Sequence, residues 1–249
     1  YCDTQKIEFI STPYDLNSAI FLNKLGVKTF KVASADIVDH QMHNFLARTG
    51  KKVIISTGMS LMKEIEDVIK IYKKFKNKKY SLLHCVSNYP CTDKPLNLKN
   101  ILTLKKKFKC EVGFSDHSVG NQASIVSIGY GATIIEKHFT KSKSLDGPDH
   151  LASSTPKEFQ SLVSDLRRTK NMLGSHNRKI QKEEKIMRKI SRKSMMYNQN
   201  FDKGHKIQNS DISLIRPGTG LLGDKINFFL NKRLKRKVKK YQNITFKDV

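Results

Sequence analysis

The chain has 249 residues, 38% of them hydrophobic, and its 47 basic against 22 acidic residues give a formal net charge of +25. This length allows one large core or a large domain with a small appendage. The charge suggests an anionic partner, but lysines occur in nearly every segment, which favours a lysine-rich background over a nucleic-acid-binding protein. No run approaches eighteen uninterrupted apolar residues, so we expect neither a membrane span nor a signal peptide. Cys2, Cys85, Cys91 and Cys110 lack metal-binding spacing, which predicts reduced thiols in a cytoplasmic protein.

Short apolar runs alternate with amphipathic stretches through residues 1–175. The predicted strands are Ile7–Ile10, Thr29–Val32, Lys52–Ile55, Tyr80–His84, Glu111–Phe114 and Ala132–Ile135. The predicted helices are Leu16–Leu25, Gln41–Thr49, Leu61–Lys74, Leu98–Phe108 and Asn121–Tyr130. This alternation is typical of a parallel α/β sheet covered by helices. A closed (β/α)8 TIM barrel needs eight strands, so we expect a barrel lacking its first two βα units, with an open six-stranded sheet as the alternative.

The C-terminal third changes character. A helix is predicted over Pro156–Leu173, because Pro156 lies in its first turn and a glycine follows its end. The charged segment 176–192 is predicted to be a linker, and the turn-rich residues 193–249 a small second domain. This domain holds a weak internal repeat, in which Lys203–Ile212 corresponds to Lys240–Val249.

Two histidines stand in short strings that each follow a predicted strand. His117 lies in Gly113-Phe114-Ser115-Asp116-His117-Ser118, and His138 in Glu136-Lys137-His138-Phe139-Thr140. In a parallel barrel both side chains would lie at the C-terminal mouth, where active sites are built. Two imidazoles there could hold a divalent metal and leave coordination positions open for substrate. A histidine that is only hydrogen-bonded is the alternative at each position.

These strings occur with others in a characteristic order. The others are Phe9–Tyr14, Phe30–Asp36, Ile55–Met59, Leu82–Cys85, Tyr89-Pro90, Gly147–His150 and Ile215–Gly220. Together they resemble the sialic acid synthase family, whose members condense phosphoenolpyruvate with an N-acetylated amino sugar to make nonulosonic acids. The resemblance implies a TIM barrel with a manganese-type site, where Mg²⁺ or Co²⁺ could substitute, and an antifreeze-like (SAF) domain over 193–249. It also implies a domain-swapped homodimer, and two further strands before Tyr1 without which the chain would be an incomplete enzyme.

The resemblance assigns roles to particular residues. His117 and His138 would be metal ligands, and Asp36 and Tyr89 catalytic residues. Phosphoenolpyruvate would be bound by Thr12, Lys31, Ser34, Ser56, Ser87 and Ser115. The amino sugar would be bound by Asp36, Tyr89, Asp149 and the partner subunit's Arg216. Two positions depart from the family pattern, because Ser87 replaces a frequent Asn and Asp36 a frequent Glu.

The position of Lys31 gives a second, physical reason to expect a bound anion. Lys31 is predicted at an interior-facing strand end, where an unpaired ammonium is costly. A bound carboxylate or phosphate would supply the missing charge, and a salt bridge to Asp36 or Asp116 is the alternative.

The sequence is compatible with three hypotheses for the function. The first is a nonulosonate synthase, and the string His150-Leu151-Ala152-Ser153 weakly favours N-acetylneuraminate or legionaminate over pseudaminate as its product. The second is a basic nucleic-acid-binding protein, for which the basic run 232–240 is the best argument. That run lacks the aromatic interleaving of single-strand binders, so a solvated ribbon face is favoured. The third is an inactive synthase fragment.

Overall fold

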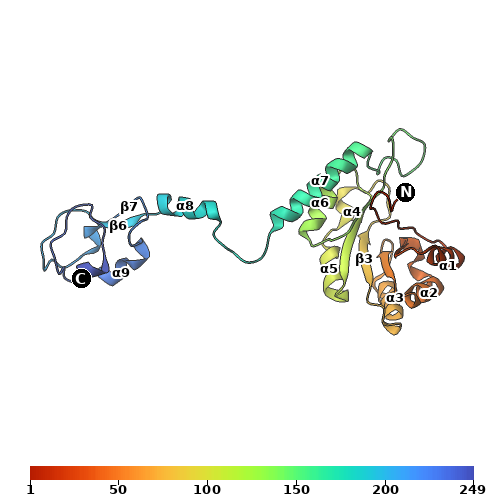
Figure 1. Cartoon of the computed structure of the whole chain (residues 1–249), viewed down its shortest axis with the longest axis horizontal. Helices are drawn as coiled ribbons and strands as arrows, with labels where there is room; N and C mark the ends of the chain where they lie inside the picture. Colours follow the sequence, from red (N-terminus) through yellow and green to blue (C-terminus); the bar gives the residue numbers. More distant parts are fainter. The chain divides into compact units, whose positions relative to one another are not determined.

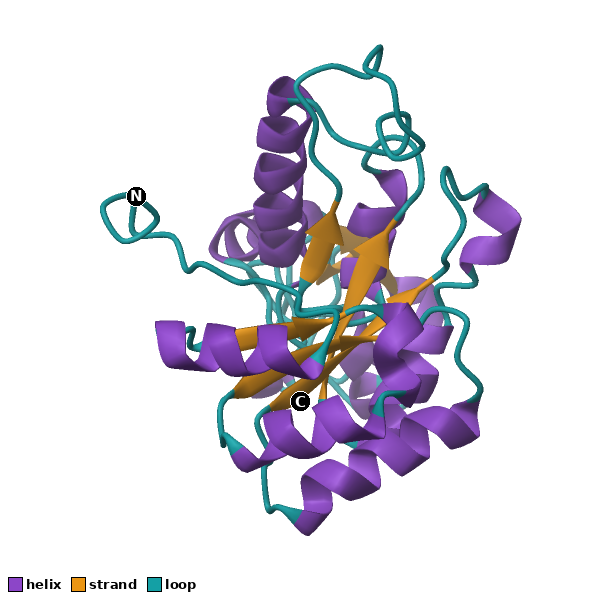
Figure 2. Cartoon of the chain, turned by 90° about the vertical axis from the view of Figure 1, so that its right-hand side faces the viewer, coloured by secondary structure: helices purple, strands orange, loops and turns teal.

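The computed structural model describes residues 1–249, which divide into two compact units, Tyr1–Gly174 and Ser175–Val249 (Figure 1). The first unit is built on one curled sheet of parallel strands surrounded by helices (Figure 2). In both sequence and space the strands run β1 (Thr29–Val32), β2 (Lys52–Ser56), β3 (Tyr80–Cys85), β4 (Glu111–Asp116) and β5 (Ile135–Lys137). The parallel α/β architecture predicted from the alternation is confirmed.

All helices of the first unit except α4 (Asp93–Leu96) lie close to predicted positions, and the single turn of α4 was not predicted. The others are α1 (Leu16–Leu25), α2 (His40–Arg48), α3 (Met62–Lys74), α5 (Asn100–Phe108), α6 (Gln122–Gly129) and α7 (Pro156–Leu173). Local capping explains why the bounds of α1 and α7 could be predicted. Asp15 accepts a hydrogen bond from the Ser18 amide at 2.8 Å, and Gly26 ends α1 in the left-handed conformation. Thr155 and Glu158 form a capping box at the start of α7.

Strand alternation separates an apolar face from a polar one. Phe30, Ile55 and Phe114 are fully buried in the core between sheet and helices. The residues in between, among them Lys31 and Ser115, therefore point to the opposite face of the curled sheet. This alternation places the polar side chains of neighbouring strands on one surface.

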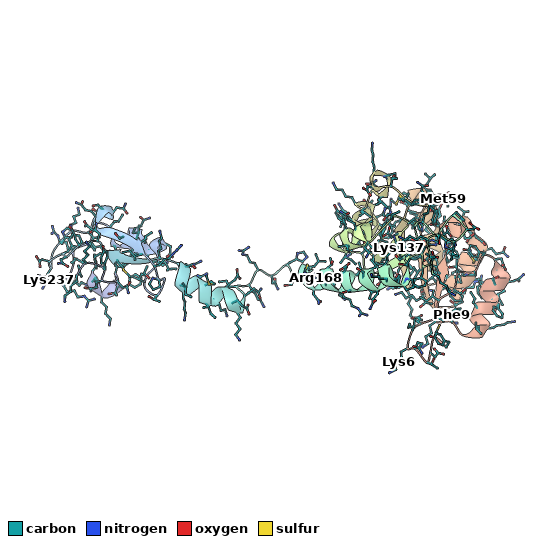
Figure 3. All side chains as sticks on the ribbon, turned by 90° about the horizontal axis from the view of Figure 1, so that it is seen from above. Lys6, Phe9, Met59, Lys137, Arg168 and Lys237 are labelled. Atoms are coloured by element: carbon teal, nitrogen blue, oxygen red, sulfur yellow. The ribbon has the colours of Figure 1, made fainter.

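The first predicted strand does not form. Residues 7–10 form no strand, and only Ser11 makes a bridge to Phe30. Ile7 and Phe9 are 64% and 50% exposed, and Figure 3 labels Phe9. A strand is stabilised by cross-strand partners and by burial, and this segment has little of either.

The last predicted strand is shifted. It begins at Ile135 rather than Ala132, because residues 130–132 form the turn that ends α6, with the Ala132 amide bonded to the Ser127 carbonyl at 3.1 Å. This strand still joins the sheet, which has five strands rather than six because the first predicted strand is missing. Its completion to an eight-stranded barrel stays a prediction.

The second unit contains α8 (Lys182–Ser191), the antiparallel pair β6 (Ser194–Tyr197) and β7 (Ile212–Ile215), and α9 (Ile226–Phe229). Much of the segment 176–192, predicted as a linker, is thus helical. Its side chains are exposed, which is why its polar composition suggested a connector. The basic run 232–240 alternates exposed cations with the buried side chains of Leu234 and Val238. None of the helices in either unit is long and apolar enough to cross a membrane.

The internal repeat of the second unit is confirmed. The carboxylates of Asp211 and Asp248 accept hydrogen bonds from the amides of Gln208 and Thr245, both at 2.8 Å, and each caps a short 3₁₀ turn. Seven residues before each aspartate the backbone is left-handed, with φ of 89° at Gly204 and 61° at Tyr241. The second repeat therefore places a tyrosine where the first has glycine, a conformation that disfavours a side chain. The antifreeze-like character of this unit stays a prediction.

Candidate active site

A cavity of about 530 Å³ lies at the C-terminal ends of the strands in the first unit. A larger hollow lies at the opposite end of the same sheet, but the smaller one contains the predicted chemistry. Nine of the twelve predicted site residues line it. They are Thr12, Lys31, Ser34, Ser56, Ser87, Tyr89, Ser115, His117 and His138.

The register of the sheet explains this convergence. Cys85 of β3 is paired with Ser115 of β4, which is paired with Glu136 of β5. Partners in one row of a parallel sheet point to the same face, so these side chains share the surface that carries Lys31. His117 and His138 follow two residues after Ser115 and Glu136. The spacing of two, together with the shared register, brings both imidazoles to one edge.

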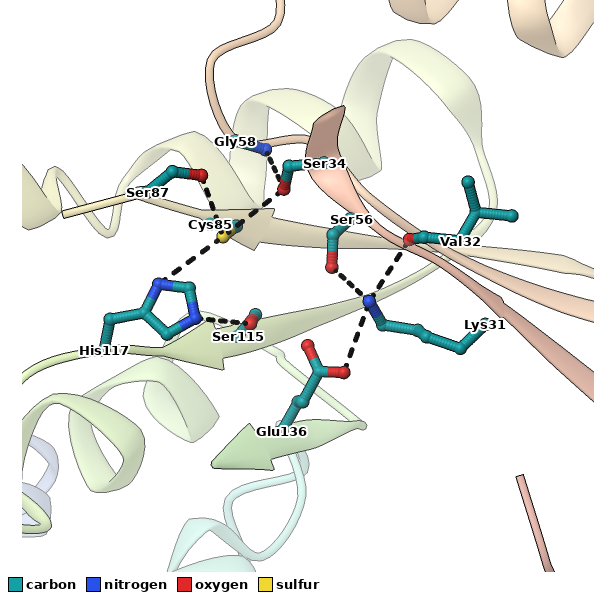
Figure 4. Close-up of polar contacts among 10 residues, drawn as sticks. All are labelled: Lys31, Val32, Ser34, Ser56, Gly58, Cys85, Ser87, Ser115, His117 and Glu136. Carbon is teal, nitrogen blue, oxygen red and sulfur yellow. Dashed lines mark hydrogen bonds and ion pairs between the residues drawn. The ribbon is translucent and has the colours of Figure 1, made fainter. Parts of the chain in front are cut away.

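Lys31 is buried and already has three polar partners (Figure 4). Its Nζ donates to Ser56 Oγ at 2.8 Å and to the Val32 carbonyl at 3.2 Å, and it lies 3.2 Å from Glu136 Oε1. The two salt bridges that we weighed for Lys31 are therefore wrong, since its partner is Glu136. An anion that binds Lys31 must either share the ammonium group with the Glu136 carboxylate or displace that carboxylate.

Glu136 is the site residue that the sequence analysis missed. It was part of a recognised string but was given no role. Its position two residues before His138 was the available signal, because alternate residues of a strand point to the same face. Cys85 was missed in the same way, and its Sγ lies 3.8 Å from His117 Nδ1. All four cysteines are free, as expected.

The two imidazoles are arranged in a way that suits a divalent metal. Nδ1 of His117 lies 2.8 Å from the Val86 carbonyl, which can only accept, so the proton sits on Nδ1. Nε2 is then the nitrogen with a lone pair for a metal, and its one protein contact is the Ser115 hydroxyl at 3.4 Å (Figure 4). The rings of His117 and His138 are 5.2 Å apart, centroid to centroid. His138 Nδ1 is 3.8 Å from Asp149 Oδ2, which is longer than a hydrogen bond, so this contact leaves Nε2 of the ring available to a metal. The donor set therefore fits an ion held by the two Nε2 atoms.

The pKa values of the two histidines are shifted in opposite directions. Burial, together with the neighbouring His117, lowers the pKa of His138, so this imidazole is neutral at pH 7. Burial also opposes protonation of His117, but its hydrogen bonds to Cys85 and to the Val86 carbonyl outweigh burial and raise its pKa. No group of three or more His, Cys, Asp or Glu side chains could hold a metal by itself. A metal here would need further ligands from water or substrate.

Tyr89 covers the histidines. Its ring centroid lies 4.1 Å from that of His117 and 5.4 Å from that of His138. Burial raises the pKa of the Tyr89 phenol to about 12, so its hydroxyl stays protonated at pH 7 and can donate a hydrogen bond to a ligand.

Three predicted site residues do not line the cavity. Asp36 lies in the 3₁₀ turn next to it, with a buried Oδ2 that has no partner and a pKa raised by burial and by Asp39. Asp149 lies on the loop beside His138 and is half exposed. Arg216 belongs to the second unit, where its Nε donates to the Ser191 carbonyl at 2.9 Å.

A buried ion pair is formed by the two residues that directly precede His117 and His138 in the sequence. Asp116 and Lys137 are partners across β4 and β5, their side chains are almost completely buried, and Lys137 Nζ is 3.2 Å from Asp116 Oδ2. Asp116 also accepts hydrogen bonds from the amide and hydroxyl of Ser118 and from the Ser124 hydroxyl, and Lys137 (labelled in Figure 3) donates to the Ser118 carbonyl. The pair thus ties together the two strand ends that precede His117 and His138.

We expect Lys137→Met to lower the free energy of unfolding by about 3–5 kcal/mol, because it leaves the Asp116 carboxylate buried without its counter-charge. Urea denaturation measures this loss. The exposed pair Lys63–Asp67 is the comparison, since Lys63→Met should cost less than about 1 kcal/mol. The double variant Asp116→Asn/Lys137→Met should recover part of the stability. Equal losses for Lys137→Met and Lys63→Met would contradict the importance of the buried pair.

Fold and cavity place the first unit among α/β proteins with a polar site at the C-terminal ends of parallel strands. A sequence model of the NeuB family matches residues 1–178, and the chain belongs to this family. The N,N'-diacetyllegionaminic acid synthase of Legionella pneumophila is 40% identical over 92% of this chain and 65% of its own length. The pseudaminic acid synthase of Campylobacter jejuni is 31% identical over 92% of this chain and 66% of its own length.

A solved structure agrees with these relatives. The N-acetylneuraminic acid synthetase of Leptospira borgpetersenii serovar Hardjo-bovis superimposes with a TM-score of 0.70 at 37% identity, over 74% of this chain and 65% of that one. The relatives are thus nonulosonic acid synthases, as the resemblance implied. The chain spans about two thirds of their length.

Proposed function

We propose that the protein to which this chain belongs condenses phosphoenolpyruvate with an N-acetylated amino sugar, giving a nonulosonic acid and phosphate. The observation that carries this proposal is the cavity at the C-terminal ends of the strands. It combines two metal-competent imidazoles, a buried lysine and several hydroxyls in one hollow. Family membership and the named activities of the relatives support the same reaction class.

Each part of the cavity has a role in this reaction. Lys31 and the hydroxyls of Thr12, Ser34, Ser56, Ser87 and Ser115 would hold the carboxylate and phosphate of phosphoenolpyruvate through charge-assisted and neutral hydrogen bonds. The C3 carbon of phosphoenolpyruvate attacks the aldehyde carbon of the sugar, water adds at C2, and phosphate leaves by C–O cleavage. His117 and His138 would hold a divalent cation such as Mn²⁺, Mg²⁺ or Co²⁺, which would polarise the aldehyde as a Lewis acid.

The acceptor sugar would lie on the Tyr89 side of the cavity. There the phenol can donate a hydrogen bond, and Asp149 and the unpartnered Asp36 are the nearby carboxylates proposed to accept from sugar hydroxyls. The identity to the diacetyllegionaminic acid synthase is higher than that to the pseudaminic acid synthase. This favours a 2,4-diacetamido sugar, from which diacetyllegionaminic acid is formed, as the acceptor. N-acetylmannosamine is the second acceptor to test.

A substrate panel tests the proposed reaction. The full open reading frame is expressed and incubated with phosphoenolpyruvate, Mn²⁺ and each candidate amino sugar, and inorganic phosphate is measured. We expect phosphate release that requires both the sugar and phosphoenolpyruvate, and a nonulosonic acid of matching mass. Release without any sugar, or none with the whole panel while the folded protein still binds phosphoenolpyruvate, would contradict the proposal.

We further propose that Arg216 completes an active site in trans, within a domain-swapped homodimer. Arg216 is exposed and precedes the Pro217-Gly218 turn, so its guanidinium can reach a ligand held by another subunit. The expected partner is the N-acyl group of the sugar, which accepts hydrogen bonds.

Complementation between two variants measures this arrangement. His117→Ala subunits mixed with Arg216→Ala subunits should regain up to about a quarter of wild-type activity, because in a statistical mixture half the dimers are mixed and each has one intact site. Each variant alone is the control and should be nearly inactive. Heterodimers that form without regaining activity would show that Arg216 acts within its own subunit.

A further inference from the structure

A second hollow of the first unit lies away from the candidate active site. It has a volume of about 980 Å³ and is formed where β2, β3 and β4 begin, at the opposite end of these strands. Its lining is Lys52, Lys73, Lys76, Asn77, Lys78, Lys79, Tyr80, Ser81, Lys109, Cys110 and Glu111. No residue of this lining takes part in the proposed synthase reaction.

The lining is far more basic than the chain as a whole. Six of its eleven residues are lysines, whereas lysine and arginine together make up 47 of 249 residues in the chain. Glu111 is its one acidic residue, and it is already bound to Lys52 at 3.1 Å and to the Ser81 hydroxyl at 2.6 Å. The other five lysines form no ion pair. A uniformly lysine-rich background does not account for this concentration of unpaired charge.

Helix ends explain only part of the cluster. Helices α3 and α5 end beside this hollow, and each C-terminus carries about half a negative charge, which favours nearby cations such as Lys73 and Lys109. Lys52, Lys78 and Lys79 instead lie at or just before the starts of strands. Six lysines against one carboxylate and two helix ends leave an excess of roughly four positive charges.

Two of the lysines occupy backbone positions that disfavour a side chain. Lys76 and Lys109 follow α3 and α5 with φ of 55° and 51°, where glycine or asparagine is usual. The loop is held in place by Asn77, whose Nδ2 donates to the Ala47 and Lys51 carbonyls and whose Oδ1 accepts from the Lys79 amide. Because glycine is favoured in this conformation, replacing either lysine with glycine removes its charge without adding backbone strain.

We propose that this hollow binds a small polyanion with two or more phosphates, of the nucleotide class. Its volume lies within the range of small-ligand pockets, about 300–1,000 Å³. The unpaired ammonium groups of the rim bind phosphate oxygens. The ring of Tyr80, half-buried against Tyr72 at 5.6 Å between centroids, is the aromatic group of the lining that a base can contact. A nucleic acid would use an extended basic groove, whereas these lysines surround a single hollow.

Calorimetry with ATP and with inorganic tripolyphosphate at low salt tests the proposal on the whole chain. Lys76→Gln/Lys78→Gln/Lys79→Gln should weaken the binding of both at least about tenfold, since charged contacts to phosphate are lost. The matched control is Lys24→Gln/Lys157→Gln/Lys170→Gln, which removes the same charge from exposed, unpaired lysines elsewhere on this unit and should change affinity less than about twofold. Lys31→Ala should leave ATP binding unchanged, because it alters only the other cavity.

A second pair of variants distinguishes weaker ligand binding from unfolding of the protein. Lys76→Gly and Lys109→Gly each remove a side chain from a left-handed backbone position, which relieves strain there. Both variants should therefore keep or raise the melting temperature while weakening ATP binding. Tighter binding of ATP than of tripolyphosphate supports the nucleotide class, whereas equal binding would show that the base contributes nothing and would contradict that class. The proposal is overturned if the control triple weakens binding as much as the cavity triple, if Lys31→Ala abolishes ATP binding, or if a short RNA binds this face and ATP does not.

Discussion

His117→Ala and His138→Ala are each expected to abolish metal-dependent phosphate release. The two Nε2 atoms are the only protein donors that we assign to the cation, and a Lewis acid contributes several kcal/mol, so each loss should exceed about a thousandfold. Turnover of the full open reading frame with Mn²⁺ measures the effect. Calorimetric titration of Mn²⁺ into each variant tests the site without relying on activity.

A histidine outside the cavity provides the control for these variants. His176 is exposed in the second unit, and His176→Ala should retain both turnover and metal binding. Circular dichroism should show that all three variants are folded. Wild-type turnover that continues unchanged in excess chelator would disprove the metal site.

Lys31→Ala is expected to weaken phosphoenolpyruvate binding by about 10–150-fold, since a charge-assisted hydrogen bond contributes about 1.5–3 kcal/mol. The loss should appear in the Michaelis constant for phosphoenolpyruvate and in direct calorimetric titration. The effect on the sugar should be small by comparison, because Lys31 lies on the side of the cavity formed by Ser56 and Glu136.

Glu136→Gln is the informative companion to this variant. It removes the carboxylate that now pairs with Lys31 at 3.2 Å but keeps the shape of the side chain. If the ligand must displace Glu136, this variant should bind phosphoenolpyruvate at least as tightly as the wild type, even if turnover falls. Normal phosphoenolpyruvate affinity in Lys31→Ala would remove Lys31 from the binding site altogether.

Elements that depend on interactions between nearby residues were predicted more accurately than elements that need partners far away in the sequence. Helices α1 and α7 were predicted residue for residue, because apolar spacing, Asp15, Gly26 and the Thr155 box all act within a few residues. The Ile7–Ile10 strand was predicted on the same kind of local pattern and does not form. A strand depends on partners distant in the sequence, and here only Ser11 has one.

By itself the sequence determined the parallel α/β class, the repeat in the second unit, and nine residues that share one cavity. The two histidines were found because residues after consecutive parallel strands meet at one edge of a sheet, and the other seven residues came from the family resemblance. Only the tertiary structure decided which charges pair there. Lys31 lies more than one hundred residues from Glu136 in the chain, and Asp116 meets Lys137 through the register of β4 and β5. Such pairings depend on distances across the sheet, which no local pattern encodes.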